Sequence, residues 1–357
     1  MKQPKVKLII LFTLNLIGTS LMANADSNTN KQMLTPEKVT AISQFWQSVT
    51  EATYTTHDNI SIAYTTNFKR PNKPYVVIVP GRSESYLKYQ ELMYDFDQRG
   101  FDTVVIDHRG QGLSQRLLTN RFKGYVNSFD DYAQDLHQLL DEVIPQNYPE
   151  HHEEAFMLAH SMGGAIALRY LQIQQHKIKA LVLSSPMIAI SSGDIPKGLA
   201  KLVVESGSKL NQWFSDSPWY FLGQSDSNQT SYQDNKLMHS QERFQRFQNL
   251  YQTKPELKLG GVTFKWLQQA LAANKNIFSD LSKLSTPILL MQSGEEHIVD
   301  NSAQNEFCQQ LHKIQPQSCI GGKPLTIDGA YHELLFEIDE YRSQALTHTL
   351  DWFIAQH

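Results

Sequence analysis

Segment 155–168 constrains the fold of this chain more than any other stretch, because it combines a buried strand, a tight turn and a helix around Ser161. Residues 156–159 are all apolar, as in a central parallel strand that is covered on both faces. Gly163 and Gly164 follow the serine, and good helix formers come next. A serine at such a turn is held in a strained conformation that exposes its hydroxyl. We therefore expect an exposed serine where a central strand ends.

Other apolar runs place this segment in a larger sheet. The first two runs alternate apolar and polar residues around a turn, which indicates an antiparallel hairpin. The later runs alternate with helical stretches, which predicts a mostly parallel α/β sheet with helices on both faces. The eight expected strands are Glu51–Thr56, Ile60–Thr65, Tyr75–Val79, Thr103–Asp107, 156–159, Ala180–Ser184, Pro287–Gln292 and Lys323–Ile327. Helices are expected over Tyr86–Arg99, over Ser128–Ile144 with Ser128 as N-cap and Pro145 as its end, after Ser161, and over Asp339–Ala355.

Residues 187–283 interrupt this alternation. The stretch predicts amphipathic helices and loops, and it is rich in aromatic residues. It follows a core strand, at the carboxyl end of the sheet where α/β proteins bind ligands. We therefore predict a helical cap over 187–283 that is inserted into a core formed by 37–186 and 284–357. Most of the aromatic side chains of the cap are expected to pack in a small core of their own.

The N-terminus predicts export. Lysines at positions 2, 5 and 7 precede a mostly apolar stretch over 8–22, and Ala23-Asn24-Ala25 matches an A-x-A cleavage signal. We predict a signal peptide over 1–25 that is cleaved after Ala25, a linker over 26–36, and a periplasmic or secreted protein. The alternative is a membrane anchor through an uncleaved N-terminus, although the apolar stretch is shorter than the roughly 20 residues that span a bilayer.

The charge balance argues against nucleic acid as a partner. The formal net charge is −4, and no basic run occurs beyond the N-terminus. Removal of 1–25, which holds three lysines and no acid, leaves −7. Segment 187–283 holds 11 basic and 8 acidic residues, so its net charge is +3. This contrast favours a substrate with a phosphate group, or contact with an anionic surface.

The two cysteines, Cys308 and Cys319, leave two alternatives. In an exported protein they can form a disulfide, which would stabilise the fold by about 3 kcal/mol. Otherwise they remain two unpaired thiols. Their spacing and the lack of paired histidines nearby give no pattern of metal ligands. We expect neither a metal nor another cofactor.

A serine hydroxyl becomes a good nucleophile only beside a base that is itself oriented by an acid. Around an exposed serine of the G-x-S-x-G type, the acid and then the histidine follow later in the chain, on loops after strands. His332 follows the last predicted strand and is the expected base. The loop after the preceding strand offers Glu295, Glu296 and Asp300. We prefer Glu296 as the acid and keep Asp300 as the alternative.

Ester cleavage also needs two N–H groups that stabilise the negative carbonyl oxygen. One comes from the residue after the nucleophile, here Met162. The other comes from the loop after the strand Tyr75–Val79, where Pro80 has no N–H and Arg82 is the expected donor. Each such donor stabilises the transition state by about 3–4 kcal/mol.

Four stretches carry a resemblance to a known family: Val79–Tyr86 with Lys88-Tyr89, Asp107–Ser114, Ala159–Gly164 and Gly329–Phe336. With them the chain resembles the serine α/β-hydrolases, and within these the monoacylglycerol-lipase-like group, most closely the bacterial lysophospholipases. The second and last stretches are the most specific, and the likeness covers nearly the whole mature chain.

The resemblance implies a set of roles. They are Ser161 as nucleophile, His332 as base, Glu296 as acid, and Arg82 with Met162 at the oxyanion hole. Two positions depart from the common pattern, because Pro80 stands where many relatives carry histidine and Ala159 replaces the first glycine of G-x-S-x-G. The bacterial lysophospholipases resemble this chain in both features, which favours them over the monoacylglycerol lipases.

The combined patterns predict an α/β-hydrolase fold and a serine hydrolase that cleaves the carboxylic ester of a single-chain lipid. A lysophospholipid is the preferred substrate, with an acyl-enzyme on Ser161. The cap would hold the acyl chain, and the protein would contact a membrane surface transiently. A monoacylglycerol lipase or broad carboxylesterase is the alternative. A non-catalytic binding protein on the same fold is a remote alternative.

Overall fold

The computed structural model describes residues 34–357 apart from 152–153, 192–194 and 228–229. The predicted signal peptide and most of the predicted linker, residues 1–33, lie outside the described residues. A search of the described helices for one that is both long and apolar enough to span a bilayer finds none.

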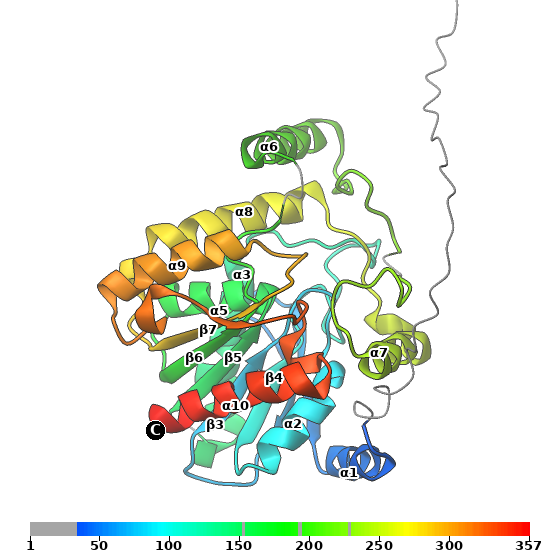
Figure 1. The fold of residues 1–357 in the computed structure, drawn as a ribbon. Helices are drawn as coiled ribbons and strands as arrows, with labels where there is room; N and C mark the ends of the chain where they lie inside the picture. The colour runs from blue at the N-terminus through cyan, green and yellow to red at the C-terminus, as the bar shows by residue number, and fades with distance from the viewer. Residues whose placement is uncertain (1–33, 152–153, 192–194, 228–229) are drawn as a thin grey trace, which may run out of the picture. The chain divides into compact units, whose positions relative to one another are not determined.

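Eight strands form one sheet in the order β1-β2-β4-β3-β5-β6-β7-β8 (Figure 1). Strand β2 pairs antiparallel with both β1 and β4, and all other neighbours are parallel. The strands are β1 (Thr50–Thr55), β2 (Ser61–Asn67), β3 (Tyr75–Val79), β4 (Asp102–Ile106), β5 (Ala155–His160), β6 (Ile178–Ser184), β7 (Ile288–Ser293) and β8 (Leu325–Ile327). The predicted mostly parallel, eight-stranded sheet with an antiparallel hairpin is confirmed.

Helices cover both faces of the sheet, as predicted. One buried cluster packs α3, α5, α8 and α9 on one face, and a second packs α1, α2 and α10 on the other (Figure 1). The helices are α1 (Pro36–Trp46), α2 (Gln90–Asp97), α3 (Asp130–Gln138), α4 (Ile144–Asn147), α5 (Met162–Ile173), α6 (Lys197–Phe214), α7 (Gln241–Thr253), α8 (Phe264–Ser279), α9 (Asn301–Ile314) and α10 (Asp339–Ala355). The central strands β3, β4 and β5 are buried along their whole length between these layers.

The helix expected over Ser128–Ile144 differs from the prediction at both ends. Phe129, not Ser128, occupies the N-cap position of α3. A π-helical turn over Leu139–Val143 then joins α3 to α4, which continues through Pro145 to Asn147. Proline cannot donate a backbone hydrogen bond, but the π turn shifts the hydrogen-bond register just before it. The chain therefore stays helical where the sequence predicted an end.

Residues 187–283 contain α6, α7 and α8, between β6 and β7. The boundaries of the cap stay a prediction. Helix α8 of this segment contributes Trp266 to the main core beside α5. Other aromatic residues of the segment point outward, with Trp213 76% and Phe214 73% exposed. The expectation was that most of the aromatic residues pack in a core of the cap itself, and these three do not.

The structure joins Cys308, in α9, to Cys319 by a disulfide. Both residues are buried, and the bond closes the chain between α9 and β8. Of the two alternatives that the sequence left for these cysteines, the structure therefore contains the disulfide.

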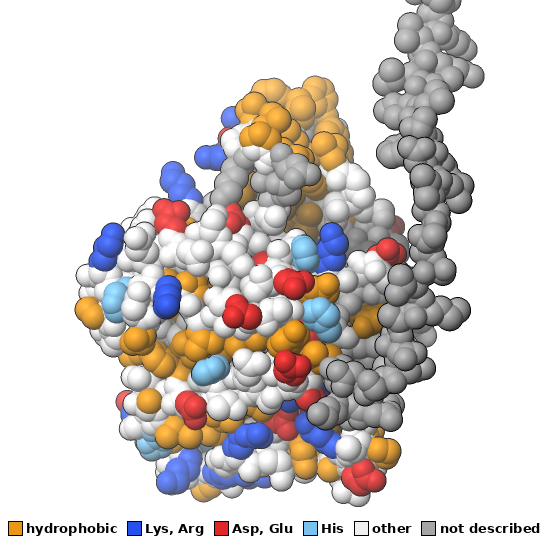
Figure 2. Space-filling model, in the orientation of Figure 1, with side chains coloured by type: hydrophobic (Ala, Val, Ile, Leu, Met, Phe, Trp, Pro, Cys, Tyr) orange, Lys and Arg blue, Asp and Glu red, His pale blue; other side chains and the backbone are white. Residues whose placement is uncertain are grey.

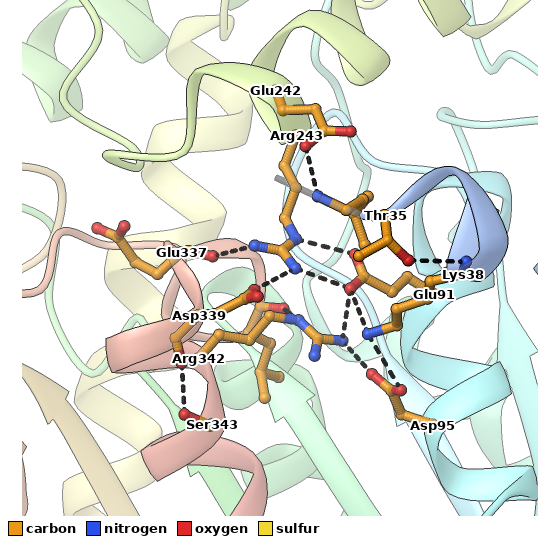
Figure 3. Close-up of polar contacts among 12 residues, drawn as sticks. Thr35, Lys38, Glu91, Asp95, Glu242, Arg243, Glu337, Asp339, Arg342 and Ser343 are labelled. Carbon is orange, nitrogen blue, oxygen red and sulfur yellow. Dashed lines mark hydrogen bonds and ion pairs between the residues drawn. The ribbon is translucent and has the colours of Figure 1, made fainter. Parts of the chain in front are cut away.

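A network of ionic contacts, most of whose members are buried, ties four helices together on the α10 side of the sheet (Figure 3). We call it the Arg243 cluster; its members are Lys38, Glu91, Asp95, Arg243, Asp339 and Arg342. Arg243 of α7 forms a two-pronged contact with Glu91 of α2, at 2.9 and 2.8 Å. Arg342 of α10 binds Asp95 of α2 at 2.6 Å, and Lys38 of α1 binds Glu91 at 3.0 Å.

Candidate active site

The turn between β5 and α5 has the strained geometry that the sequence predicted. Ser161 has φ 51° and ψ −117°, a conformation that residues other than glycine rarely adopt. Its two following glycines leave no room for a side chain. A Cβ atom on Gly163 would lie 2.1 Å from the Val79 carbonyl oxygen, and one on Gly164 would lie 2.6 Å from Pro186 Cβ. The start of α5 can therefore pack directly against the loops after β3 and β6.

Three loops bring a serine, a histidine and an acid into line. Ser161 Oγ lies 2.9 Å from His332 Nε2, and His332 Nδ1 lies 2.8 Å from Glu296 Oε2. The three residues follow β5, β8 and β7, whose carboxyl ends share one edge of the sheet. The side chains of His332 and Glu296 are only 3% and 2% exposed. The structure thus brings together the three residues that the sequence proposed as nucleophile, base and acid.

Glu296 is held as a carboxylate. Ser293 Oγ donates to its Oε2 at 2.6 Å, and the Ile298 and Val299 N–H groups donate to its Oε1 at 2.7 and 3.2 Å. Burial raises the pKa of Glu296, but the contact with His332 and these donors outweigh it and lower the pKa to about 2. An ionised acid at Nδ1 fixes the His332 ring with Nε2 directed at the serine hydroxyl.

The other two acids of this loop have different places. Asp300 is the N-cap of α9, where its Oδ1 accepts from Ser302 N–H at 2.9 Å and from Ala303 N–H at 3.4 Å. Glu295 is exposed, and its backbone N–H donates to the Ala330 carbonyl at 2.9 Å. The alternative acid Asp300 therefore serves α9, and Glu296 alone of the three candidates is seen in contact with His332.

Two backbone N–H groups beside Ser161 are available to a negative oxygen. Gly81 N–H donates to Glu84 Oε2 at 2.5 Å, and Ser83 N–H donates to Gln111 Oε1 at 3.2 Å. Within the described part of the chain, no hydrogen bond occupies the N–H of Arg82 or of Met162. Met162 is the first residue of α5, where the helix dipole also favours negative charge. The structure thus leaves free the two donors that the sequence predicted.

The side chain of Arg82 points into the segment between β6 and β7. Its guanidinium donates to the Gly260 carbonyl and, at 3.1 Å, to Ser83 Oγ. It also lies 5.6 Å from the ring centre of Trp266. Burial lowers the pKa of Arg82 to about 10, so the group is a cation at neutral pH. Arg82 therefore connects the loop after β3, residues 80–83, which we call the oxyanion loop, to residues 187–283, which we call the helical insertion.

Sequence reasoning missed a buried group of charges next to these loops, which we call the Lys88 cluster. It consists of Glu84, Lys88, His160 and Glu333, all at most 7% exposed. The Lys88 ammonium contacts Glu84 and lies 2.5 Å from Glu333 Oε2. His160 Nε2 lies 3.9 and 3.7 Å from the same two carboxylates, and its Nδ1 lies 3.1 Å from the Ser184 carbonyl.

The charges of the Lys88 cluster compensate one another. Burial raises the pKa of Glu84, but Lys88 and His160 outweigh it and lower the pKa to about 2. Burial lowers the pKa of His160 below its ordinary value. Two carboxylates and a histidine here are close enough to hold a metal ion, but the Lys88 ammonium already takes the cation position between them. Their signal in the sequence was the family resemblance, because all four residues lie in stretches that carry it: Val79–Tyr86, Lys88-Tyr89, Ala159–Gly164 and Gly329–Phe336.

A cavity of about 570 Å³ lies beside the site, between the core and the helical insertion. Arg82 and Glu333, which adjoin the oxyanion loop and His332, form part of its core wall. Its other wall comes from the insertion and includes Met238, Phe247 and Tyr251. The insertion also contributes charged and polar side chains, so charged and apolar groups both line the cavity, and such a mixed lining suits an amphiphilic molecule.

Comparison with known proteins places the chain in a defined group. The serine aminopeptidase S33 family (Hydrolase_4) matches residues 70–339. Lysophospholipase L2 of Escherichia coli K12 is 36% identical over 312 residues, which cover 87% of this chain and 89% of that protein. A probable lysophospholipase L2 of Haemophilus influenzae is 32% identical over 81% of this chain and 87% of its own length.

Solved structures share the fold. A soluble variant of monoglyceride lipase from Saccharomyces cerevisiae, in complex with a substrate analog, superimposes with a TM-score of 0.63 and 17% identity. The match covers 86% of this chain and 94% of that structure. At this identity the likeness concerns the α/β-hydrolase fold.

Proposed function

We propose, from the premise that this chain belongs to the serine aminopeptidase S33 family, that it is a lysophospholipase. The chain is a serine hydrolase of lipid esters, as its lysophospholipase relatives indicate. The observation that carries the assignment of roles is the line from Ser161 through His332 to Glu296, with two unoccupied N–H groups beside the serine. The 36% identity to lysophospholipase L2 supports the choice of substrate.

In the proposed reaction, Ser161 Oγ attacks the carbonyl carbon of the ester while His332 Nε2 takes its proton. The negative oxygen of the tetrahedral intermediate accepts hydrogen bonds from the N–H groups of Arg82 and Met162. The carbon–oxygen bond to the glycerol then breaks, and His332 gives its proton to the leaving alcohol. Water, activated by His332, next attacks the acyl-enzyme and releases the fatty acid and the free serine. No step needs a cofactor.

The proposal includes a transient contact with a membrane surface through α6. Figure 2 shows hydrophobic side chains gathered over this helix. They include Leu199 and Leu202, which are 53% and 58% exposed, and Trp213 and Phe214 near its end. An apolar helix face beside a positively charged segment suits the interface of an anionic membrane. Trp213→Ser should therefore reduce co-sedimentation with phosphatidylglycerol vesicles and leave hydrolysis of a soluble ester unchanged, and unchanged co-sedimentation would contradict the contact.

We also propose that the protein is exported and that cleavage occurs after Ala25, with anchoring through an uncleaved N-terminus as the alternative. The disulfide between Cys308 and Cys319 supports export, because such bonds persist in oxidising compartments. Mass spectrometry of the protein from separated cell fractions tests this. A periplasmic or secreted chain that begins at Asp26 supports the proposal, and a membrane-bound chain that retains residues 1–25 contradicts it.

A substrate panel tests the lysophospholipase proposal. Purified protein should hydrolyse lysophosphatidylcholine with a higher kcat/KM than monoacylglycerol or short p-nitrophenyl esters. A preference for monoacylglycerol would favour the monoacylglycerol lipase alternative, and a preference for short esters would favour a broad carboxylesterase. Ser161→Ala is the control for contaminating activity. A fluorophosphonate probe that labels the wild type no more than Ser161→Ala would instead support the non-catalytic alternative.

A further inference from the structure

Residues 107–114, the motif after β4, supply no group to the triad, but their side chains reach the oxyanion loop. His108 Nε2 lies 3.0 Å from the Pro80 carbonyl oxygen. Gln111 Nε2 donates to the Gly81 carbonyl at 2.8 Å, and Gln111 Oε1 accepts from Ser83 N–H at 3.2 Å. Gln111 is only 2% exposed. One buried amide therefore holds the backbone immediately before and immediately after Arg82.

The first of these contacts determines the direction of the Arg82 N–H. The Gly81 carbonyl and the Arg82 N–H belong to one planar trans peptide, so they point in opposite directions. Because Gln111 holds the carbonyl, the N–H must point away from Gln111. The preceding peptide is held as well, since Gly81 N–H donates to Glu84. Among the described residues, the Arg82 N–H is left without a partner between these anchored groups.

We propose that Gln111 is a positioning residue whose amide holds the Gly81–Arg82 peptide so that the Arg82 N–H faces the carbonyl oxygen of the substrate. The inference rests on the proposed function, because a negative oxygen forms there only if Ser161 attacks an ester. A preorganised donor is effective because it needs no reorientation when charge develops. A peptide that is free to rotate would lose that advantage.

The chemistry of this contact requires an amide. The Gly81 carbonyl needs a donor and Ser83 N–H needs an acceptor, and a primary amide supplies both. A glutamate at position 111 would supply two acceptors, and its charge would repel the Gly81 carbonyl. A methionine would fill a similar volume and supply neither a donor nor an acceptor. Gln111→Glu and Gln111→Met therefore separate repulsion from simple loss of the contact.

Gln172 provides a matched control in another part of the molecule. It is 6% exposed, its Nε2 donates to the Ile277 carbonyl at 2.8 Å, and its Oε1 accepts from Arg169 at 2.9 Å. The first contact links α5 to α8, the second lies within α5, and neither involves the oxyanion loop. Gln172→Met thus removes a comparable buried amide, and it should lower Tm while leaving the kinetic constants unchanged.

The experiment compares hydrolysis of p-nitrophenyl butyrate with binding of a trifluoromethyl ketone, which forms a negatively charged adduct with a catalytic serine. In Gln111→Met we expect kcat to fall by about tenfold or more with KM nearly unchanged, since one donor is worth up to several hundredfold. The inhibition constant of the ketone should rise by the same factor as kcat/KM falls. Gln111→Glu, which keeps the size of the side chain, should show a larger fall in kcat and a larger rise in the inhibition constant of the ketone.

The outcomes separate this inference from the proposed function. A wild-type protein that cleaves no ester overturns both. An active wild type whose Gln111→Met and Gln111→Glu variants bind the ketone as tightly as Gln172→Met does overturns the inference alone. The same holds if kcat falls only in proportion to the loss of folded protein, measured by circular dichroism. Parallel losses in kcat/KM and ketone affinity, with folding retained, support it.

Discussion

Two sets of largely buried charges in this molecule have similar compositions and different neighbours. Around the site, Glu296 and the Lys88 cluster contact loops that carry Ser161, His332 and the Arg82 N–H. On the α10 side of the sheet, the Arg243 cluster joins α1, α2, α7 and α10 (Figure 3). Both contain carboxylates whose pKa is held below its ordinary value by cations. The difference lies in what each set holds in place, reacting groups in one case and helices in the other.

The comparison predicts separable effects. Loss of a charge at the site should change the rate of the reaction, and loss of a charge in the Arg243 cluster should change the free energy of unfolding. The following substitutions test this division, from the largest expected effect to the smallest.

Neutralising the acid of the site should have the largest effect. Glu296→Gln should lower kcat by about 10⁴-fold, because the amide no longer stabilises the protonated form of His332 or its required tautomer. Steady-state hydrolysis of p-nitrophenyl butyrate measures this. Asp339→Asn neutralises a half-exposed acid of the Arg243 cluster and should leave kcat unchanged. Equal losses in the two variants would contradict the division.

Removing the central cation of the Arg243 cluster should mainly affect folding. Arg243→Met leaves the buried Glu91 without its two-pronged partner. We expect the free energy of unfolding to fall by about 3–5 kcal/mol, as for other buried ion pairs that lose one member. Urea unfolding followed by circular dichroism measures it. The kcat per folded molecule should stay at the wild-type value, and a large fall in kcat would show that the cluster also shapes the site.

Removing the cation of the Lys88 cluster should lower kcat more than removing the central cation of the Arg243 cluster does. Lys88→Met leaves Glu84 and Glu333 facing each other, and the loops that carry Arg82 and His332 should shift. We expect kcat to fall by about 100-fold, the effect of a misplacement near 1 Å. Lys88→Arg, which keeps the charge, should restore part of the activity. If Lys88→Met retained wild-type kcat, the cluster would have no role in positioning these loops.

Measured per pH unit, acid titration should change the free energy of unfolding by the smallest amount of these tests, and it should not distinguish the two sets. The pKa of Glu296 is about 2 in the folded protein, and that of Glu91 is also lowered. A lowered pKa means that the stabilisation is complete above the unfolded value, near 4.5 for glutamate, and is lost as the pH falls toward the folded value.

Replacing either glutamate by glutamine removes one group whose protonation makes the free energy of unfolding depend on pH. Glu296→Gln and Glu91→Gln should each make the fall in unfolding free energy between pH 4.5 and 2 shallower, by up to about 1.4 kcal/mol per pH unit. Urea unfolding at a series of pH values checks this. An unchanged slope in Glu296→Gln would mean that Glu296 is not ionised in the folded protein at low pH.

Much of the fold and part of the site could be predicted from the sequence. Apolar runs of five or six residues that alternate with helices identify a parallel sheet, because strands covered on both faces must be apolar throughout. The turn at Ser161 and the place of His332 after the last strand follow from the same pattern, since parallel strands bring their carboxyl ends to one edge. The helix through Pro145 could not be predicted, because a π turn depends on local packing.

Chain order by itself thus determined which loops meet at Ser161, but it did not determine which side chains in those loops point at one another. Glu296 and Asp300 are four residues apart, and only the folded loop directs Glu296 to His332 while Asp300 caps α9. The contacts of Lys88 with Glu333 and of Gln111 with Gly81 join residues far apart in the chain. Such contacts depend on the direction of each side chain in three dimensions, which strand order and residue type leave open.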